Sequence, residues 1–279
     1  MGSRVSRAGY VVRPIPRERQ PVLDRLSSAS RRFHVHALVE LDVTRAAEQI
    51  RLAQPSVTWT GFVIATVARA VAQHPEVNAR KAGNRLLLFD RVDIGATVER
   101  SVDGHAVLDI AMIPAADATS CADITAQLGH SKHGPAPTHR EGRLTAALVR
   151  LPGPIRRTAF RMAATRPSVS ATFGPAIGVT SIGMFTHGWG WAIPVAPLTL
   201  IVTVGSVVDR PAVHDGQIVS RPMLPLTLSF DHAVIDGAPA ARFTETLRTL
   251  TETATVLDRH PVAATRLSGP ARSPVVPSR

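Results

Sequence analysis

The feature that most constrains this chain is a long stretch, residues 174–208, that contains no Asp, Glu, Lys or Arg. An uncharged run of this length is typical of a membrane-spanning helix. However, Pro175, Pro194, Pro197 and several glycines interrupt it, and proline breaks a helix because it lacks the amide N–H. The stretch therefore predicts two buried strands joined by a loop, and a protein with no stable membrane insertion.

Composition places the chain among globular proteins. Its 279 residues, of which 44% are hydrophobic and 19% charged, are enough to bury a substantial core in one large domain. Cys121 is the only cysteine, which excludes a disulfide framework and any multi-cysteine metal site. The N-terminal segment is rich in arginine and lacks the apolar run of a secretory signal, so we expect a cytoplasmic protein.

The formal net charge of +11 comes almost entirely from arginine, since Lys81 and Lys132 are the only lysines. A nucleic acid, an anionic membrane surface or a polyanionic small ligand would each account for such a charge. The arginines are spread along the chain and aromatic residues make up only 4%, so there is little surface on which bases could stack. We therefore expect no nucleic-acid partner, and an arginine-rich composition without functional meaning is a further explanation.

Helix-type and strand-type patterns alternate along the chain and predict a single mixed α/β domain. The segments that read as helices are residues 21–32, 45–54, 59–73, 122–128 and 237–252. The segments that read as strands are residues 34–43, 86–89, 92–98, 106–113, 177–183, 198–208, 217–219 and 224–230. The strands at 86–89 and 92–98 are expected to pair as a hairpin.

Three segments set the boundaries of this domain. Residues 1–20 predict an extended N-terminal arm and residues 259–279 a disordered tail, which leaves 21–258 as the folded domain. Within it, residues 142–166 alternate leucine with arginine and predict an inserted basic helical hairpin, split at 152–154. This hairpin either packs on the body with its arginines in water or contacts a membrane surface or phosphate groups.

One histidine stands apart from the others. His232 follows a buried-looking strand and precedes a helix, and Asp231 and Asp236 flank it. Polar residues at the end of an apolar strand are costly to bury, and an imidazole oriented by carboxylates is suited to act as a general base. A structural histidine at a strand end is the alternative.

The remaining histidines are easier to explain without a function. His34 and His36 share one face of a strand, but no third metal ligand is evident near them in the sequence. His130, His133 and His139 are expected in a solvated loop. The sequence therefore predicts no metal site.

The segment FDHAVIDGAPAARF, residues 230–243, resembles the DHRxxDG signature of dihydrolipoamide acyltransferases, the core components of 2-oxoacid dehydrogenase complexes. It also resembles the HHxxxDG signature of chloramphenicol acetyltransferases, which belong to the same superfamily. The likeness covers roughly residues 20 to 255. Further segments match in the family's order: VELDVT (39–44), HPEVNA (74–79), VDIGATVE (92–99), GVTSIGMF (178–185) and DGQIVSRPMLPLTLSF (215–230).

The resemblance implies a chloramphenicol acetyltransferase-like fold, a mixed β-sheet flanked by helices. It implies transfer of an acyl group between coenzyme A and a thiol such as dihydrolipoamide, or a hydroxyl acceptor. By the same likeness, His232 removes the acceptor's proton, Asp236 fixes the geometry of the site, and Thr180 donates a hydrogen bond to the tetrahedral oxyanion. The family's active sites lie between subunits, so the resemblance also implies a homotrimer. It does not indicate which arginines contact coenzyme A.

The chain departs from the family in several places. It carries no lipoyl or subunit-binding domain, so we expect a stand-alone catalytic domain that receives a lipoyl group from a separate lipoyl-carrying protein. Position 233 is Ala where the dihydrolipoamide enzymes have Arg, and Ser181 replaces the Asn of the family's SNxG turn. A non-catalytic scaffold that has the same fold and binds coenzyme A or a partner is therefore the alternative function.

Overall fold

The structure of the chain is a computed structural model that describes residues 15, 19–30, 32–102, 105–133, 153–183 and 188–258. Almost all of the predicted arm at 1–20, the first half of the predicted basic hairpin and the predicted tail at 259–279 lie outside these residues. Among the described residues, no helix is long and apolar enough to cross a membrane. The uncharged stretch instead contributes two strands, as the sequence predicts.

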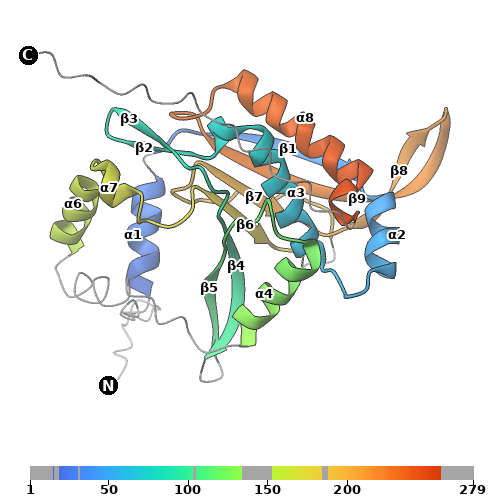
Figure 1. The fold of residues 1–279 in the computed structure, drawn as a ribbon, viewed down its shortest axis with the longest axis horizontal. Coiled ribbons are helices and arrows are strands. Elements are labelled where there is room, and N and C mark those ends of the chain that lie inside the picture. The colour runs from blue at the N-terminus through green and yellow to red at the C-terminus, as the bar shows by residue number, and fades with distance from the viewer. Residues whose placement is uncertain are drawn as a thin grey trace, which may run out of the picture.

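A mixed sheet of seven strands forms the centre of the fold (Figure 1). The strand order is β1-β9-β7-β6-β4-β5, and β8 pairs with the first part of the long strand β9. Only the β4–β6 and β6–β7 pairs are parallel. The strands are β1 (His34–Asp42), β4 (Ile94–Val102), β5 (His105–Ile113), β6 (Ile177–Ser181), β7 (Leu200–Val204), β8 (Val208–His214) and β9 (Gln217–Asp231).

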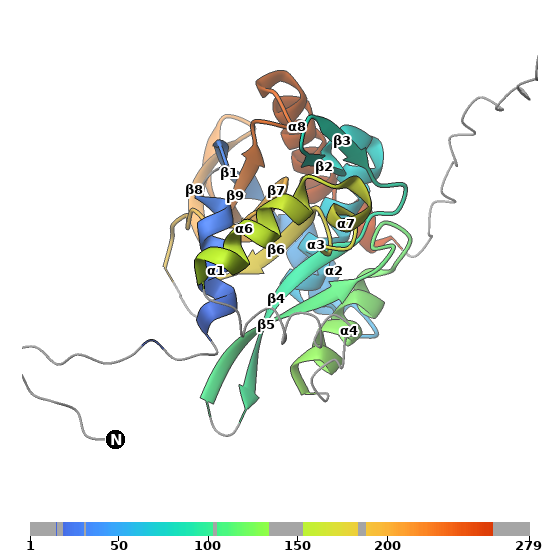
Figure 2. The ribbon, with the colours of Figure 1, turned by 90° about the vertical axis from the view of Figure 1, so that its left-hand side faces the viewer.

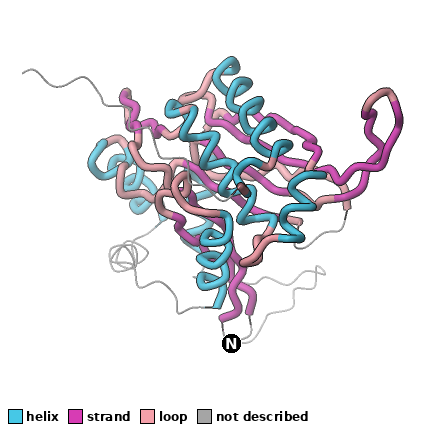
Figure 3. The backbone as a smooth tube through the Cα atoms, turned by 45° about the vertical axis from the view of Figure 1, so that its right-hand side comes forward, coloured by secondary structure: helices cyan, strands magenta, loops and turns pink. Residues whose placement is uncertain are grey.

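Helices cover one face of this sheet and one of its ends. Figure 1 shows α2, α3, α4 and α8 in front of the strands and α1 and α6 at the left-hand end, and Figure 2 views that end face on, with α6 in front. The β8–β9 hairpin projects from the opposite side (Figure 3). The helices are α1 (Gln20–Ala29), α2 (Thr44–Leu52), α3 (Trp59–Gln73), α4 (Cys121–His133), α6 (Gly153–Ala164), α7 (Pro167–Ser170) and α8 (Gly237–Thr253), with short 3-10 turns at Pro75–Val77 and Thr255–Leu257.

The core lies between the sheet and these helices. Residues 224–231 of β9 and residues 61–68 of α3 are each buried without interruption. Phe230 meets Phe243 of α8 edge to face, with ring centroids 5.8 Å apart. A Cβ at Gly61 would collide with Thr125 of α4, so glycine there lets α3 and α4 approach closely. Burial of this apolar layer is the main source of the fold's stability.

The predicted hairpin between residues 86–89 and 92–98 is wrong. Instead, β3 (Arg85–Leu88) pairs back with β2 (Ala79–Ala82) in a separate two-stranded sheet, while β4 pairs with β5 and β6. The turn between β2 and β3 contains Gly83 at φ +60°, a conformation that favours glycine. Residues 79–82 lack the apolar alternation of a strand, so the local pattern did not reveal this pairing.

Other elements differ in extent rather than in type. The helices predicted at 21–32, 45–54, 59–73 and 237–252 are confirmed. Residues 217–219 and 224–230 belong to one continuous strand, and 198–208 contains β7 and the first residue of β8. His130 and His133 lie on α4 rather than in a loop, and His139 is outside the described residues.

A buried arginine fastens the segment that leads into β6. Arg80 of β2 is 5% exposed, and its guanidinium donates to the carbonyls of Ser170, Gly174 and Pro175 at 2.6–2.7 Å. Burial lowers the pKa of Arg80 to about 10. Nearby, Arg157 of α6 pairs with Asp24 of α1 at 3.3 Å. The contacts of Arg80 attach α7 and the segment after it to β2, and the ion pair attaches α6 to α1.

Candidate active site

The turn that carries His232 begins where β9 ends. The carbonyl of Asp231 accepts hydrogen bonds from the amides of Val234 and Ile235, which reverses the chain before α8. The amide of His232 donates to the carbonyl of Phe33, 2.7 Å away, in the residue just before β1. The backbone of His232 is therefore held from both sides, and its side chain is 44% exposed at the molecular surface.

Asp236 lies one turn further along, next to the histidine. Its Oδ1 is 3.4 Å from Nδ1 of His232, and its side chain is 84% exposed. Asp236 occupies the N-cap position of α8 but makes no capping hydrogen bond with its side chain. The carboxylate is thus available to the imidazole, and the contact at Nδ1 leaves Nε2 as the nitrogen that can exchange a proton with a substrate.

Asp231 and Arg32 form an ion pair directly behind this turn. The carboxylate of Asp231 is 3% exposed: one oxygen contacts the guanidinium of Arg32, and the other accepts from the amide of Ala233 at 3.1 Å. The sequence singles out Asp231, next to His232, but does not single out Arg32. Arg32 comes close to Asp231 because β1 pairs with β9 and sets His34 opposite Asp231. Only a correct prediction of this strand pairing would have identified Arg32.

Two further histidines line the same face of the sheet. His34 and His36 stack with ring centroids 6.2 Å apart, and Nδ1 of His36 lies 2.8 Å from the hydroxyl of Ser229. Burial lowers the pKa of His34, although the nearby carboxylate of Asp231 opposes this shift. Among the residues that the structure describes, no three His, Cys, Asp or Glu side chains cluster as metal ligands do.

Thr180 lies at the other end of the sheet from His232. It pairs with Thr203 in β7, and Thr203 pairs with Thr227 in β9, so the three threonines form one row across the sheet. His232 is five positions beyond Thr227 in the sequence. At about 3.3 Å per residue and about 4.8 Å per strand, Thr180 and His232 are on the order of 20 Å apart. A single chain brings His232 and Asp236 together but does not bring Thr180 to them.

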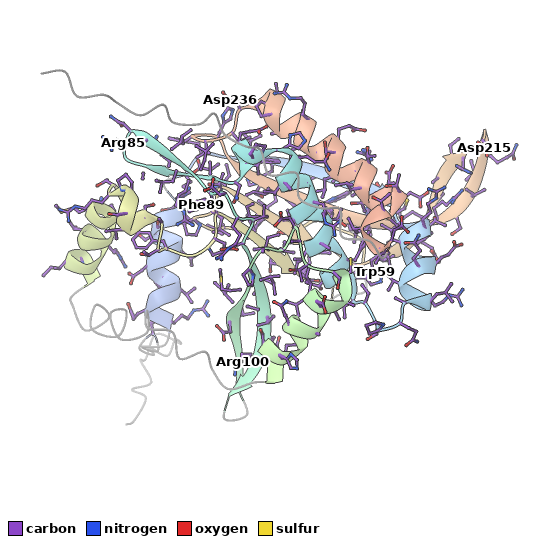
Figure 4. All side chains as sticks on the ribbon, viewed as in Figure 1. Trp59, Arg85, Phe89, Arg100, Asp215 and Asp236 are labelled. Atoms are coloured by element: carbon purple, nitrogen blue, oxygen red, sulfur yellow. The ribbon has the colours of Figure 1, made fainter. Side chains whose placement is uncertain are left out.

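A cleft of about 640 Å³ opens beside Ser181, the residue after Thr180, between the ends of β6 and β7 and the start of α3. None of the residues that line it is charged. Thr58 caps α3 by accepting from the amide of Gly61 at 3.1 Å. Figure 4 labels Trp59, at this cleft, and Asp236, at the histidine, and shows them well apart. The lining residues are Val57, Thr58, Trp59, Thr60, Ser181, Gly183, Val204, Gly205, Ser206 and Val207.

Comparison with known proteins identifies the family. The chain matches the family model of the 2-oxoacid dehydrogenases acyltransferase (catalytic domain) over residues 9–147 and 145–257. It is 28% identical over 248 residues to the lipoamide acyltransferase component of the branched-chain alpha-keto acid dehydrogenase complex of Pseudomonas putida, covering 86% of this chain and 52% of the relative. It is 25% identical over 216 residues to the mitochondrial dihydrolipoyllysine-residue succinyltransferase component of Saccharomyces cerevisiae, covering 77% of this chain and 40% of that one.

Solved structures agree with this result. The cubic core of the pyruvate dehydrogenase multienzyme complex matches with a TM-score of 0.65 at 23% identity, covering 90% of this chain and 96% of that one. A probable dihydrolipoamide acetyltransferase from Listeria monocytogenes matches with a TM-score of 0.61 at 25% identity, covering 88% and 96%. The predicted α/β acyltransferase fold is confirmed.

The fold and the sequence thus define a catalytic domain of the acyltransferase class. The chain belongs to the 2-oxoacid dehydrogenase acyltransferase family. It spans about half or less of the length of the curated relatives it matches. The two segments matched by the family model meet inside residues 142–166, and whether these residues are an insertion stays a prediction.

Proposed function

We propose that this domain transfers an acyl group between coenzyme A and a thiol acceptor of the dihydrolipoamide type. The observation that carries the proposal is the imidazole of His232, exposed at the end of β9 with its backbone fixed and Asp236 at its Nδ1. A thiol with a pKa near 8.5 is mostly protonated at neutral pH, so a nearby base increases its reactivity. A hydroxyl acceptor would depend on the base even more, because a hydroxyl is less acidic than a thiol.

In the proposed reaction, Nε2 of His232 takes the proton of the acceptor thiol while the sulfur of this thiol attacks the carbonyl carbon of the acyl-CoA thioester. The new carbon–sulfur bond produces a tetrahedral intermediate with a negatively charged oxygen. The hydroxyl of Thr180 donates a hydrogen bond to this oxygen. Collapse of the intermediate breaks the bond to the sulfur of coenzyme A, which takes the proton back from the imidazolium. Removal of one such donor costs about 10²–10³ in kcat in comparable sites.

Because one chain does not bring Thr180 to His232, we infer that the site is completed between protomers. Thr180 of one protomer would face His232 of the next in a closed homotrimer, which is the arrangement that the family resemblance implies. One solved structure that this chain matches is the cubic core of the pyruvate dehydrogenase multienzyme complex, an assembled core, which supports an oligomer. A lipoyl-carrying partner would deliver the acceptor. The cytoplasm is the expected compartment.

We infer that coenzyme A enters through the cleft beside Ser181, next to Thr180 in the chain. The cleft is large enough for an extended arm, and its hydroxyl-bearing residues suit the amides of pantetheine. The backbone amides in the first turn of α3 suit a phosphate group. No arginine is among the described residues that line this cleft, so the chain's positive charge would act on coenzyme A from outside it or from a neighbouring protomer.

The test is transfer from acetyl-CoA or succinyl-CoA to free dihydrolipoamide, followed by release of coenzyme A, in the wild type and in His232→Ala and Thr180→Ala. We expect both variants to fold as the wild type does and His232→Ala to lose activity by orders of magnitude. Arg221→Gln, which changes a partly buried arginine in β9 away from the His232 turn, is the control. The scaffold alternative predicts binding of coenzyme A without transfer. It would be favoured if the wild type binds but does not release coenzyme A.

A further inference from the structure

The turn of His232 depends on a buried carboxylate, and this carboxylate has a cationic partner from a remote segment. Asp231 is 3% exposed, whereas Arg32 is 20% exposed. An ionised carboxylate is costly to remove from water unless it is paired and hydrogen-bonded. Here both conditions are met, because one oxygen contacts Arg32 and the other accepts from Ala233.

The two partners of the Asp231 carboxylate, Arg32 and the amide of Ala233, both help to fix the position of His232. Asp231 and Ala233 are its immediate neighbours, and the hydrogen bond between them spans the histidine. The segment that carries Arg32 also carries Phe33, whose carbonyl holds the amide of His232 at 2.7 Å. Arg32 therefore ties together the start of β1 and the end of β9 at the point where the imidazole projects.

No other guanidinium in the described part of the chain is placed to replace it. Arg80 is near enough for the charge of Arg32 to lower its pKa further, but its own N–H groups are committed to the carbonyls of Ser170, Gly174 and Pro175. Position 233, next to the histidine, is alanine. Asp231 thus depends on Arg32.

We propose that Arg32 is a positioning residue for the reaction: by neutralising and orienting Asp231 it holds the His232 turn in its reactive geometry. This inference rests on the proposed role of His232 as the base. Loss of Arg32 leaves a buried, unpaired carboxylate beside the histidine, and the turn must move to hydrate it. Loss of the charge on Asp231 is milder, because an asparagine still accepts from Ala233 and the freed Arg32 reaches water.

The two sides of the pair therefore predict unequal effects. Arg32→Gln should lower kcat by about a hundredfold, the cost of a small misplacement of a catalytic group, with little change in KM for acetyl-CoA. Asp231→Asn should lower kcat less. The double variant Arg32→Gln/Asp231→Asn should recover most of the loss, because no unpaired charge remains. Arg32→Lys keeps the charge and should recover part of it.

The assay is steady-state transfer from acetyl-CoA or succinyl-CoA to dihydrolipoamide by the full chain, with the assembly state of each variant checked by light scattering. Arg221→Gln is a matched control, since Arg221 is 22% exposed and pairs with Asp42 at 3.8 Å, away from His232. It should retain wild-type kcat. A purely structural role for Arg32 would lower thermal stability without changing kcat at a temperature where the protein is folded.

An Arg32→Gln variant with the kcat of the wild type would overturn the proposal, and so would a double variant no faster than Arg32→Gln. If Arg32→Gln does not fold, the double variant must fold and exceed the activity of His232→Ala for the proposal to stand. A wild type with no transfer activity, or a fully active His232→Ala, would instead overturn the proposed function itself.

Discussion

Replacing Thr203 with valine should stabilise this protein. Thr203 and Thr227 are 3% and 1% exposed and lie directly opposite each other in β7 and β9. Neither hydroxyl has a hydrogen-bond partner among the described residues. Burying an unpaired hydroxyl costs about 1–3 kcal/mol by mutational measurements. Valine has nearly the same shape and is well suited to a strand, so Thr203→Val should raise the free energy of unfolding by about 1 kcal/mol, at the low end of that range.

The measurement is urea unfolding followed by circular dichroism, at one protein concentration because assembly contributes to apparent stability. Thr199 provides the matched control. It is 1% exposed, but its hydroxyl donates to the carbonyl of Ala79 at 2.5 Å. Thr199→Val should therefore destabilise the protein by about 1 kcal/mol or more. If Thr203→Val destabilises it as much as Thr199→Val, the hydroxyl of Thr203 is hydrogen-bonded in solution and the reasoning is wrong.

Three further outcomes follow from groups whose pKa is shifted by burial. Because burial lowers the pKa of His34 from 6.5, the unfolded chain takes up the proton first as the pH falls, so stability should decline below about pH 6.5. His34→Gln should weaken this decline, and an unchanged pH dependence of urea unfolding would contradict it. Burial raises the pKa of the Cys121 thiol to about 11, so it should resist Ellman's reagent at pH 8 until urea unfolds the chain; rapid reaction in the native state would disagree. Arg80→Met should lower stability by about 2–4 kcal/mol in thermal or urea unfolding, because three carbonyls, one buried and two partly buried, lose their donor, and a variant as stable as the wild type would refute this.

Local sequence patterns were sufficient to predict an element where the segment alone favours one secondary structure. The helix predicted at 59–73 coincides with α3, because an uninterrupted run of helix-compatible residues ends at His74 and Pro75. The buried strands of 174–208 followed from the absence of charge and the presence of proline. His232 and Asp236 could be predicted to meet because they lie within one turn of chain.

Local patterns were insufficient where contact depends on strand pairing. The sequence indicated that 86–89 is extended but not that its partner is residues 79–82. Arg32 and Asp231 are 199 positions apart, and only the register of β1 on β9 brings them together. The residues most easily missed at this site are therefore those supplied by a neighbouring strand, since register is a property of the whole sheet.

The separation of Thr180 and His232 within one chain allows a test of the assembly, in which two inactive variants complement each other. Thr180 of β6 and His232, just after β9, lie toward opposite ends of the sheet in one chain, so a site between protomers needs only one of them from each. Equal amounts of His232→Ala and Thr180→Ala, each nearly inactive alone, should be unfolded together and reassembled. The His232→Ala protomer still has Thr180, and the Thr180→Ala protomer still has His232. A site is intact when its threonine comes from the first variant and its histidine from the second. Random mixing makes about one interface in four intact, so about a quarter of wild-type activity should return. If the mixture stays as inactive as its components after mixed assembly is shown by mass spectrometry, Thr180 and His232 do not share a site across protomers.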